Sequence, residues 1–227
     1  MKTCNRIVPT YWALAAFAIT LLLVGHLSAG DDTAKAENVI KAFDGLAYRE
    51  GKDIWSVLFT NSKFTDAELK DLAELRSLRS LSIGGANITD AGLAHIAGFK
   101  KLDTLHLGRT MVTDAGLKHL ADLKDLGVLS LNSTKITDAG LVQLVSLKKL
   151  DFLYLHNTKV SDAGMKLVAK ITNLSLLNIQ ETAVTDLGLR ELATLKNLRT
   201  VYLYETKVTD AGMAELRKAL PNCKVQR

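Results

Sequence analysis

The sequence predicts an α/β solenoid, with a parallel sheet along one side and short helical segments along the other. Its main sign is a six-residue phrase, typified by ITDAGL at Ile88, that returns seven times without a change of spacing. A frame of leucines precedes each phrase, and only two prolines occur in 227 residues, which suits a continuously hydrogen-bonded architecture. The aspartates of the phrase lie 24 residues apart, at Asp66, Asp90, Asp114, Asp138, Asp162, Asp186 and Asp210.

Each 24-residue unit divides into a strand half and a helical half. In Leu105-His106-Leu107 apolar and other residues alternate with a period of two, which predicts a β-strand with one face in a core. Downstream, Leu117, Leu120 and Leu123 are spaced by three, which predicts a short helical segment that buries one stripe. A single unit cannot bury these faces, whereas stacked units can, so the units are expected to form a solenoid.

Composition narrows the class of protein. Hydrophobic residues make up 48% of the chain and charged residues 23%, which is typical of globular rather than disordered proteins. Cys4 and Cys223 are too few for a disulfide framework or an all-cysteine zinc site. The formal charge is +5, and removal of residues 1–30 would leave +3, a weak and dispersed surplus that argues against a nucleic-acid partner.

Residues 1–30 have the order of a secretory signal peptide. Two basic residues open the segment, an apolar run extends from Tyr11 to Leu27, and small residues at 28–30 precede Asp31. This order predicts export of the protein and cleavage before Asp31. The alternative is a retained membrane anchor, because an apolar run of about 17 residues lies at the lower limit for spanning a bilayer.

The repeated units occupy residues 54–221, and closing elements are expected on both sides. Residues 31–53 are predicted to form a capping helix and linker, which would cover the open end of the solenoid. Residues 222–227 are predicted to form a partial strand that closes the other end. The apolar stripe of the capping helix consists of Val39, Ile40, Phe43, Leu46 and Ala47.

Two rows of hydroxyl side chains recur with the same period. A threonine follows the strand in most units, as at Thr110, and its hydroxyl is expected to bond backbone groups of the turn. The threonine or serine of the phrase is expected at a helix N-cap, and the aspartate after it places negative charge at the positive end of the helix. Thr65 to Glu68 also matches a capping box. The predicted capping residues are Thr89, Asp90, Thr113, Asp114, Thr137, Asp138, Ser161, Asp162, Thr185, Asp186, Thr209 and Asp210.

The pattern L-x-x-L-x-L-x-x-T-x-[IV]-T-D-A-G-L, over about residues 54–227, resembles leucine-rich repeats. It is most similar to the subclass found in F-box ubiquitin-ligase receptors and in many bacterial repeat proteins. The resemblance implies a right-handed solenoid that forms part of a horseshoe, with the parallel sheet on its concave side. It also implies that proteins or other ligands bind to that concave sheet. Threonine stands where F-box receptors usually have cysteine or asparagine, and no F-box-like segment is recognisable, so an exported bacterial type fits better than a ligase receptor.

The outward residues of the strands are the candidate binding residues. If Leu105 and its equivalents point inward, their neighbours point to the concave face. Early units offer small side chains there, whereas later units offer aromatic ones, and exposed aromatic residues are common anchors of binding surfaces. Tyr154 and Tyr202 would lie roughly 10 Å apart, within reach of one partner. The candidates are Phe152, Tyr154, His156, Leu176, Gln180, Tyr202, Tyr204 and His106.

Other chemistry has weaker signs. The seven aspartates would also suit a row of calcium sites, but each has a capping role instead. His106 and His156 lie two units apart, too far to share a metal at ligand distances of about 2 Å. No HExxH, GxSxG, Walker or paired CxxC pattern occurs, so no catalytic, cofactor or metal site is predicted. A row of rim lysines suits a solvated edge better than a site for an anionic polymer: Lys63, Lys135, Lys159 and Lys207.

The sequence therefore predicts a non-enzymatic, exported repeat protein that binds a protein partner through its concave face. A polysaccharide is the second candidate ligand. The alternative function is a structural or assembly component of the cell envelope, which requires that residues 1–30 stay attached as a membrane anchor.

Overall fold

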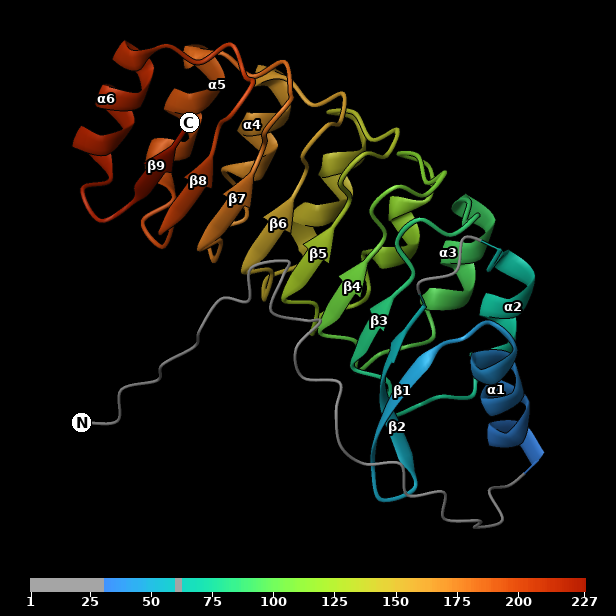
Figure 1. The fold of residues 1–227 in the computed structure, drawn as a ribbon. Coiled ribbons are helices and arrows are strands. Elements are labelled where there is room, and N and C mark those ends of the chain that lie inside the picture. The colour runs from blue at the N-terminus through green and yellow to red at the C-terminus, as the bar shows by residue number, and fades with distance from the viewer. Residues whose placement is uncertain (1–30, 60–62) are drawn as a thin grey trace, which may run out of the picture.

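One continuous sheet runs through the molecule. The computed structural model describes residues 31–59 and 63–227, and within them nine strands pair in chain order. Figure 1 shows a curved stack with the strands along its inner side and the helical segments along its outer side. This arrangement confirms the predicted α/β solenoid. The strands are β1 (Leu46–Glu50), β2 (Asp53–Leu58), β3 (Ser80–Ser82), β4 (Thr104–His106), β5 (Val128–Ser130), β6 (Phe152–Tyr154), β7 (Leu176–Asn178), β8 (Thr200–Tyr202) and β9 (Lys224–Gln226).

The sheet is parallel from β2 to β9, with equivalent residues of neighbouring units side by side. Leu105 pairs with Leu129, and Leu129 with Leu153, and all three side chains are fully buried. The predicted inner register is therefore confirmed. Each unit thus adds one apolar side chain, leucine from β3 to β7 and valine at Val57, Val201 and Val225, to a spine that runs the length of the stack.

The helical segments differ between units although the buried spacing of three residues is the same. Two central units have a 3₁₀ helix where the others have an α-helix, and a spacing of three suits both because residues i and i+3 share a face. The α-helices of the repeats are α2 (Asp66–Asp71), α3 (Asp90–Ile96), α4 (Asp162–Val168), α5 (Asp186–Glu191) and α6 (Asp210–Ala219). The 3₁₀ segments are η2 (Leu117–Leu120), η3 (Gly140–Ser146) and η4 (Leu192–Thr194).

The first end of the solenoid departs from the predicted helix and linker. Helix α1 (Asp31–Ala42) ends before Gly45, and the chain then forms β1, which pairs antiparallel with β2. Gly45 packs so closely on the Phe59 ring that a side chain there would collide with it. Ile40 of the predicted stripe is buried, but Leu46 is 47% exposed because it lies on the edge strand rather than on the helix.

The other end closes with β9, which pairs with β8 as the predicted additional strand. Cys223, just before β9, is buried, and this burial raises the pKa of its thiol. The predicted signal or anchor segment, residues 1–30, lies outside the described residues. In the part of the chain that is described, no helix combines the length and apolar composition needed to cross a membrane.

Candidate functional site

Side-chain hydrogen bonds link each repeat unit to the next and help to hold the sheet rigid. In the first six phrases the aspartate accepts the backbone N–H and the side-chain hydroxyl of the threonine or serine 23 residues later. For Asp114 and Thr137 these distances are 2.8 Å to the backbone nitrogen and 2.5 Å to the hydroxyl. Six such aspartates, from Asp66 to Asp186, form an inter-unit ladder. The sequence suggested only a role at each aspartate's own helix, so this contact was missed.

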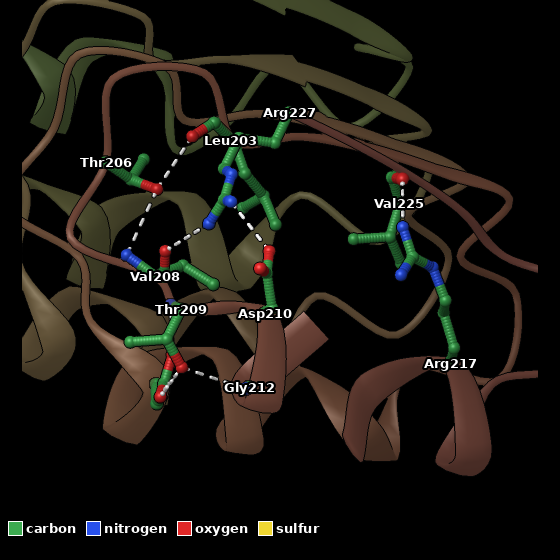
Figure 2. Close-up of polar contacts among 10 residues, drawn as sticks. Leu203, Thr206, Val208, Thr209, Asp210, Gly212, Arg217, Val225 and Arg227 are labelled. Atoms are coloured by element: carbon green, nitrogen blue, oxygen red, sulfur yellow. Dashed lines mark hydrogen bonds and ion pairs between the residues drawn. The ribbon is translucent and has the colours of Figure 1, made fainter. Parts of the chain in front are cut away.

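At the last unit the ladder ends on an arginine. Arg227 donates one hydrogen bond to the Asp210 carboxylate, at 2.6 Å, and one to the Val208 carbonyl, at 3.0 Å. Arg217 of α6 donates to the Val225 carbonyl in β9, at 3.1 Å. Figure 2 shows Arg227 reaching back to Val208 and Asp210, and Arg217 reaching from α6 to Val225. Polar side chains therefore hold β9 and the final turn in place.

The hydroxyls of the phrase occupy N-cap positions in the α-helical units. Thr89, Ser161 and Thr185 accept the N–H two residues later, and Thr209 accepts that of Gly212. Thr113 and Thr137 make the same type of bond, but turns and 3₁₀ segments follow them, so the α-helix expected there does not form.

Thr65 and Glu68 form a capping box. The Glu68 carboxylate accepts the Thr65 N–H at 2.9 Å and the Thr65 hydroxyl at 2.6 Å. The hydrogen bond from that hydroxyl lowers the pKa of Glu68 below its ordinary value. This box anchors the first repeat helix.

A second hydroxyl row fixes the turn at the end of each strand. Thr110 donates to the Leu107 carbonyl at 2.7 Å, and the threonines at 134, 158, 182 and 206 repeat this bond at 2.6–2.7 Å. The residue just before each threonine has a positive φ: Gly85, Arg109, Ser133, Asn157, Glu181 and Glu205, where the first precedes Ala86 instead. The rim of the sheet is thus a series of identical tight turns that present one side chain per unit.

Most candidate binding residues lie on the inner face of the sheet, with different exposure. Tyr204 is 55% exposed, whereas Tyr154, Tyr202 and Phe152 are half-buried. Leu176 is only 4% exposed, since Phe152 and Thr200 flank it in register on the neighbouring strands. It was wrongly chosen as a contact residue. Ser130 is also buried, between His106 and Tyr154.

Asn178 separates the two tyrosines of the middle row, since it pairs in register with Tyr154 on one side and Tyr202 on the other. Its amide is held in place: Asn178 Nδ2 donates to Gln180 Oε1 at 3.2 Å, and Asn178 Oδ1 accepts the Gln180 N–H at 3.0 Å. A short polar residue with a fixed orientation therefore lies between the strands that carry the two tyrosines.

The two histidines of this face have separate environments. Burial lowers the pKa of His106, which keeps its imidazole neutral near pH 7. His156 Nδ1 has no hydrogen-bond partner among the described residues and lies 3.7 Å from Glu181 Oε1. Across the described ranges, no three histidine, cysteine, aspartate or glutamate side chains gather as metal ligands would.

Comparison with known proteins agrees with this architecture. A family model described as "Leucine Rich repeat" matches residues 74–97. An internalin (inlF) from Listeria monocytogenes is similar in structure, with a TM-score of 0.64 and 23% identity over 76% of this chain and 47% of that one. The chain has the leucine-rich-repeat fold. No curated protein sequence matches it.

Two further leucine-rich-repeat structures are similar to this chain. Internalin C2 from the same bacterium has a TM-score of 0.58 and 24% identity, over 85% of this chain and 92% of that one. A leucine-rich-repeat protein of Leptospira interrogans has a TM-score of 0.57 and 21% identity, over 76% of this chain and 48% of that one. The chain thus spans about half the length of inlF and of the Leptospira protein. Membership of the F-box subclass stays a prediction.

Two surface features of the leucine-rich-repeat domain were not foreseen. Tyr48 and Trp55 of the first hairpin are 39% and 38% exposed, with ring centroids 5.9 Å apart. A shallow polar groove of about 470 Å³ borders the starts of β6, β7 and β8. The apolar alternation of Leu46 and Tyr48 could have revealed the hairpin, but the groove joins residues of three units. Its lining residues are Lys149, Asp151, Asn173, Ser175, Asn197 and Arg199.

Proposed function

We propose that this protein binds a protein partner through the inner face of β6, β7 and β8, without catalysing a reaction. The observation that carries the proposal is the gathering of Phe152, Tyr154, Tyr202 and Tyr204 on one face of a rigid sheet, with Tyr204 55% exposed. Aromatic side chains lose little conformational entropy on binding and offer large contact areas. The leucine-rich-repeat fold also supports a role in binding other proteins.

Pre-organisation of this face strengthens the proposal. The strands are held in register by backbone pairing, and the aspartate ladder and the threonine row fix both ends of each turn. A surface that is ordered before binding avoids much of the entropy loss that weakens association. Tyr202 and Tyr204 should therefore bind as pre-positioned side chains, unlike residues on a loop that must become ordered on binding.

The test replaces the anchors and compares the captured partners. In the variant Tyr154→Ala/Tyr202→Ala/Tyr204→Ala, cross-linking in the native envelope should lose partners that the unchanged protein captures. The matched control is Met111→Ala/Val142→Ala, which removes apolar side chains that are 45% and 52% exposed away from these tyrosines. Circular dichroism should show both variants folded. An unchanged partner set in the tyrosine variant would remove the proposal.

The proposed location is outside the cytoplasm, and it rests on the signal-like order of residues 1–30. The intact mass of the native protein tests it. Loss of about 30 residues would support cleavage and export. Full mass in the membrane fraction would favour the alternative, an anchored component of the cell envelope.

A further inference from the structure

We propose that the partner presents a basic side chain, lysine or arginine, to the two carboxylates of Glu181 and Glu205 beside Tyr202 and Tyr204. This inference rests on the proposed function and names the chemistry of the segment that binds. It concerns the edge of the inner face where β7 and β8 end, a region that the sequence did not single out.

The two glutamates occupy the same position in adjacent units. Both lie at the positive-φ turn, with φ of 53° and 54°, directly after Gln180 and Tyr204 on the inner face. Adjacent strands are about 4.8 Å apart, so the two turns are neighbours. The 3.7 Å distance from Glu181 Oε1 to His156 Nδ1 shows that the Glu181 carboxylate leans back over the inner face.

The charge along this row becomes negative only in the last two units. After Gly85 the turn residues run from basic through neutral to acidic; Glu205 belongs to the unit of Tyr202 and Tyr204, and Glu181 belongs to the unit before it. Negative charge and exposed aromatic rings therefore coincide in one place. The row reads Gly85, Arg109, Ser133, Asn157, Glu181 and Glu205.

The fold itself gives no reason for glutamate at these turns. A left-handed backbone favours glycine or asparagine, as in Gly85 and Asn157, and costs other residues roughly 1 kcal/mol. Within the described residues Glu205 makes no hydrogen bond or ion pair, and the Glu181 side chain is 39% exposed. Two carboxylates in adjacent turns also repel each other. Both costs are accounted for if the carboxylates meet a cation on binding.

Tyrosine rings suit the same ligand group. A lysine or arginine places its aliphatic stem on an aromatic face and gains a further attraction between its charge and the ring. Lys224, which pairs in register with Thr200, lies at the start of β9, at the opposite end of the strands from Glu181 and Glu205. A basic residue next to an apolar one in an extended segment would satisfy both the rings and the carboxylates.

Selection from a displayed library of random short peptides on the immobilised full chain tests the inference. The unchanged protein should enrich peptides with lysine or arginine beside an apolar residue. The variant Glu181→Lys/Glu205→Lys should weaken binding of those peptides roughly tenfold or more and enrich acidic peptides instead. The matched control Glu50→Lys/Glu74→Lys changes two glutamates away from this edge and should leave the enrichment unaltered.

The outcomes separate this inference from the proposed function. If peptides lose binding to Tyr202→Ala/Tyr204→Ala but show no basic preference, the inner face remains the site and the cationic partner is wrong. If the tyrosine variant binds the same peptides equally well, the inner-face proposal fails too. If no peptide is enriched, the result also counts against a partner segment that carries lysine or arginine. Retention of basic peptides by the charge-reversed variant overturns the inference directly.

Discussion

At the residue scale, three residues of the repeated phrase form one contact between units. The Asp114 carboxylate binds Thr137 of the next unit, and Gly140 packs against that same carboxylate. A methyl group on Gly140 would overlap Asp114 Oδ1. Threonine, aspartate and glycine thus recur together because each one needs the other two in the neighbouring unit.

A double-mutant cycle tests this dependence. Asp114→Ala should lower the free energy of unfolding by about 2–3 kcal/mol, because the Thr137 N–H and hydroxyl lose a charged acceptor. Gly140→Ala should cost about 1–3 kcal/mol by overpacking. Removal of the Asp114 carboxylate makes room for the methyl group. The decrease in the free energy of unfolding should therefore be smaller in the double variant than the sum of the decreases in the two single variants. Urea unfolding measures all three, and Gly98→Ala, which has ordinary packing space, is the control.

The left-handed turns make a second prediction. Gly85 has φ of 78° with open space where a side chain would project, whereas Arg109 has φ of 59°. Gly85→Ala should therefore lower the free energy of unfolding by about 1 kcal/mol, and Arg109→Gly should raise it by up to that amount. Thermal and urea unfolding measure the direction of the stability change in both variants. A loss of stability in Arg109→Gly would show that its side chain matters more than its backbone conformation.

His106 predicts a pH dependence. Burial lowers its pKa in the folded protein below the ordinary value of 6.5, so the unfolded chain binds this proton more readily. The resulting contribution to stability is full above pH 6.5 and falls as the pH drops below it. His106→Gln should reduce the loss of stability between pH 7.5 and pH 5.5 relative to the unchanged protein. Equal losses in both proteins, measured by urea unfolding, would contradict the assignment.

At the element scale, β9 and α6 depend on the two arginines near the chain end. The side chains of Arg227 and Asp210 are 38% and 85% exposed, so water screens their ion pair and it should contribute little to global stability. The Val208 carbonyl, however, loses its donor when Arg227 is removed. The effect of this arginine should therefore be local.

Hydrogen exchange of Arg227→Met should reveal this local role. We expect a loss below about 1 kcal/mol in global unfolding but clearly faster exchange in β8 and β9. Exchange in β4 and β5 should stay unchanged, because they lie several units away. Lys218→Met, an exposed change on α6, serves as the control. Uniformly faster exchange along the stack would contradict a local role, because it would mean that the Arg227 contacts stabilise every unit.

At the scale of the whole molecule, stability should depend on the position of a defect along the stack. Leu129 is fully buried with neighbours on both sides, whereas Leu46 is 47% exposed on the edge strand. Leu129→Ala should cost about 2–5 kcal/mol and Leu46→Ala under about 1 kcal/mol. A central defect should also weaken the coupling between the two halves, which would lower the denaturant m-value in Leu129→Ala alone.

Periodicity was enough to predict the stacked units, the buried leucine spine and the residues that face inward, because a strand alternates its faces with a fixed period. It was not enough for the first hairpin, where Gly45 ends the helix and Leu46 enters an edge strand. Nor did it separate 3₁₀ from α-helical units, since both satisfy the same spacing of buried residues.

The sequence by itself determined the 24-residue unit, its inward register and the aromatic character of the later strands. Only the tertiary structure decided which outward residues reach a partner: it buries Leu176 and Ser130, exposes Tyr204, and turns Glu181 toward the inner face. The physical reason is that exposure depends on side chains 24 residues away on both sides, together with the curvature of the stack. A repeat pattern specifies which face a residue occupies, but its neighbours' volumes decide how much of it remains accessible.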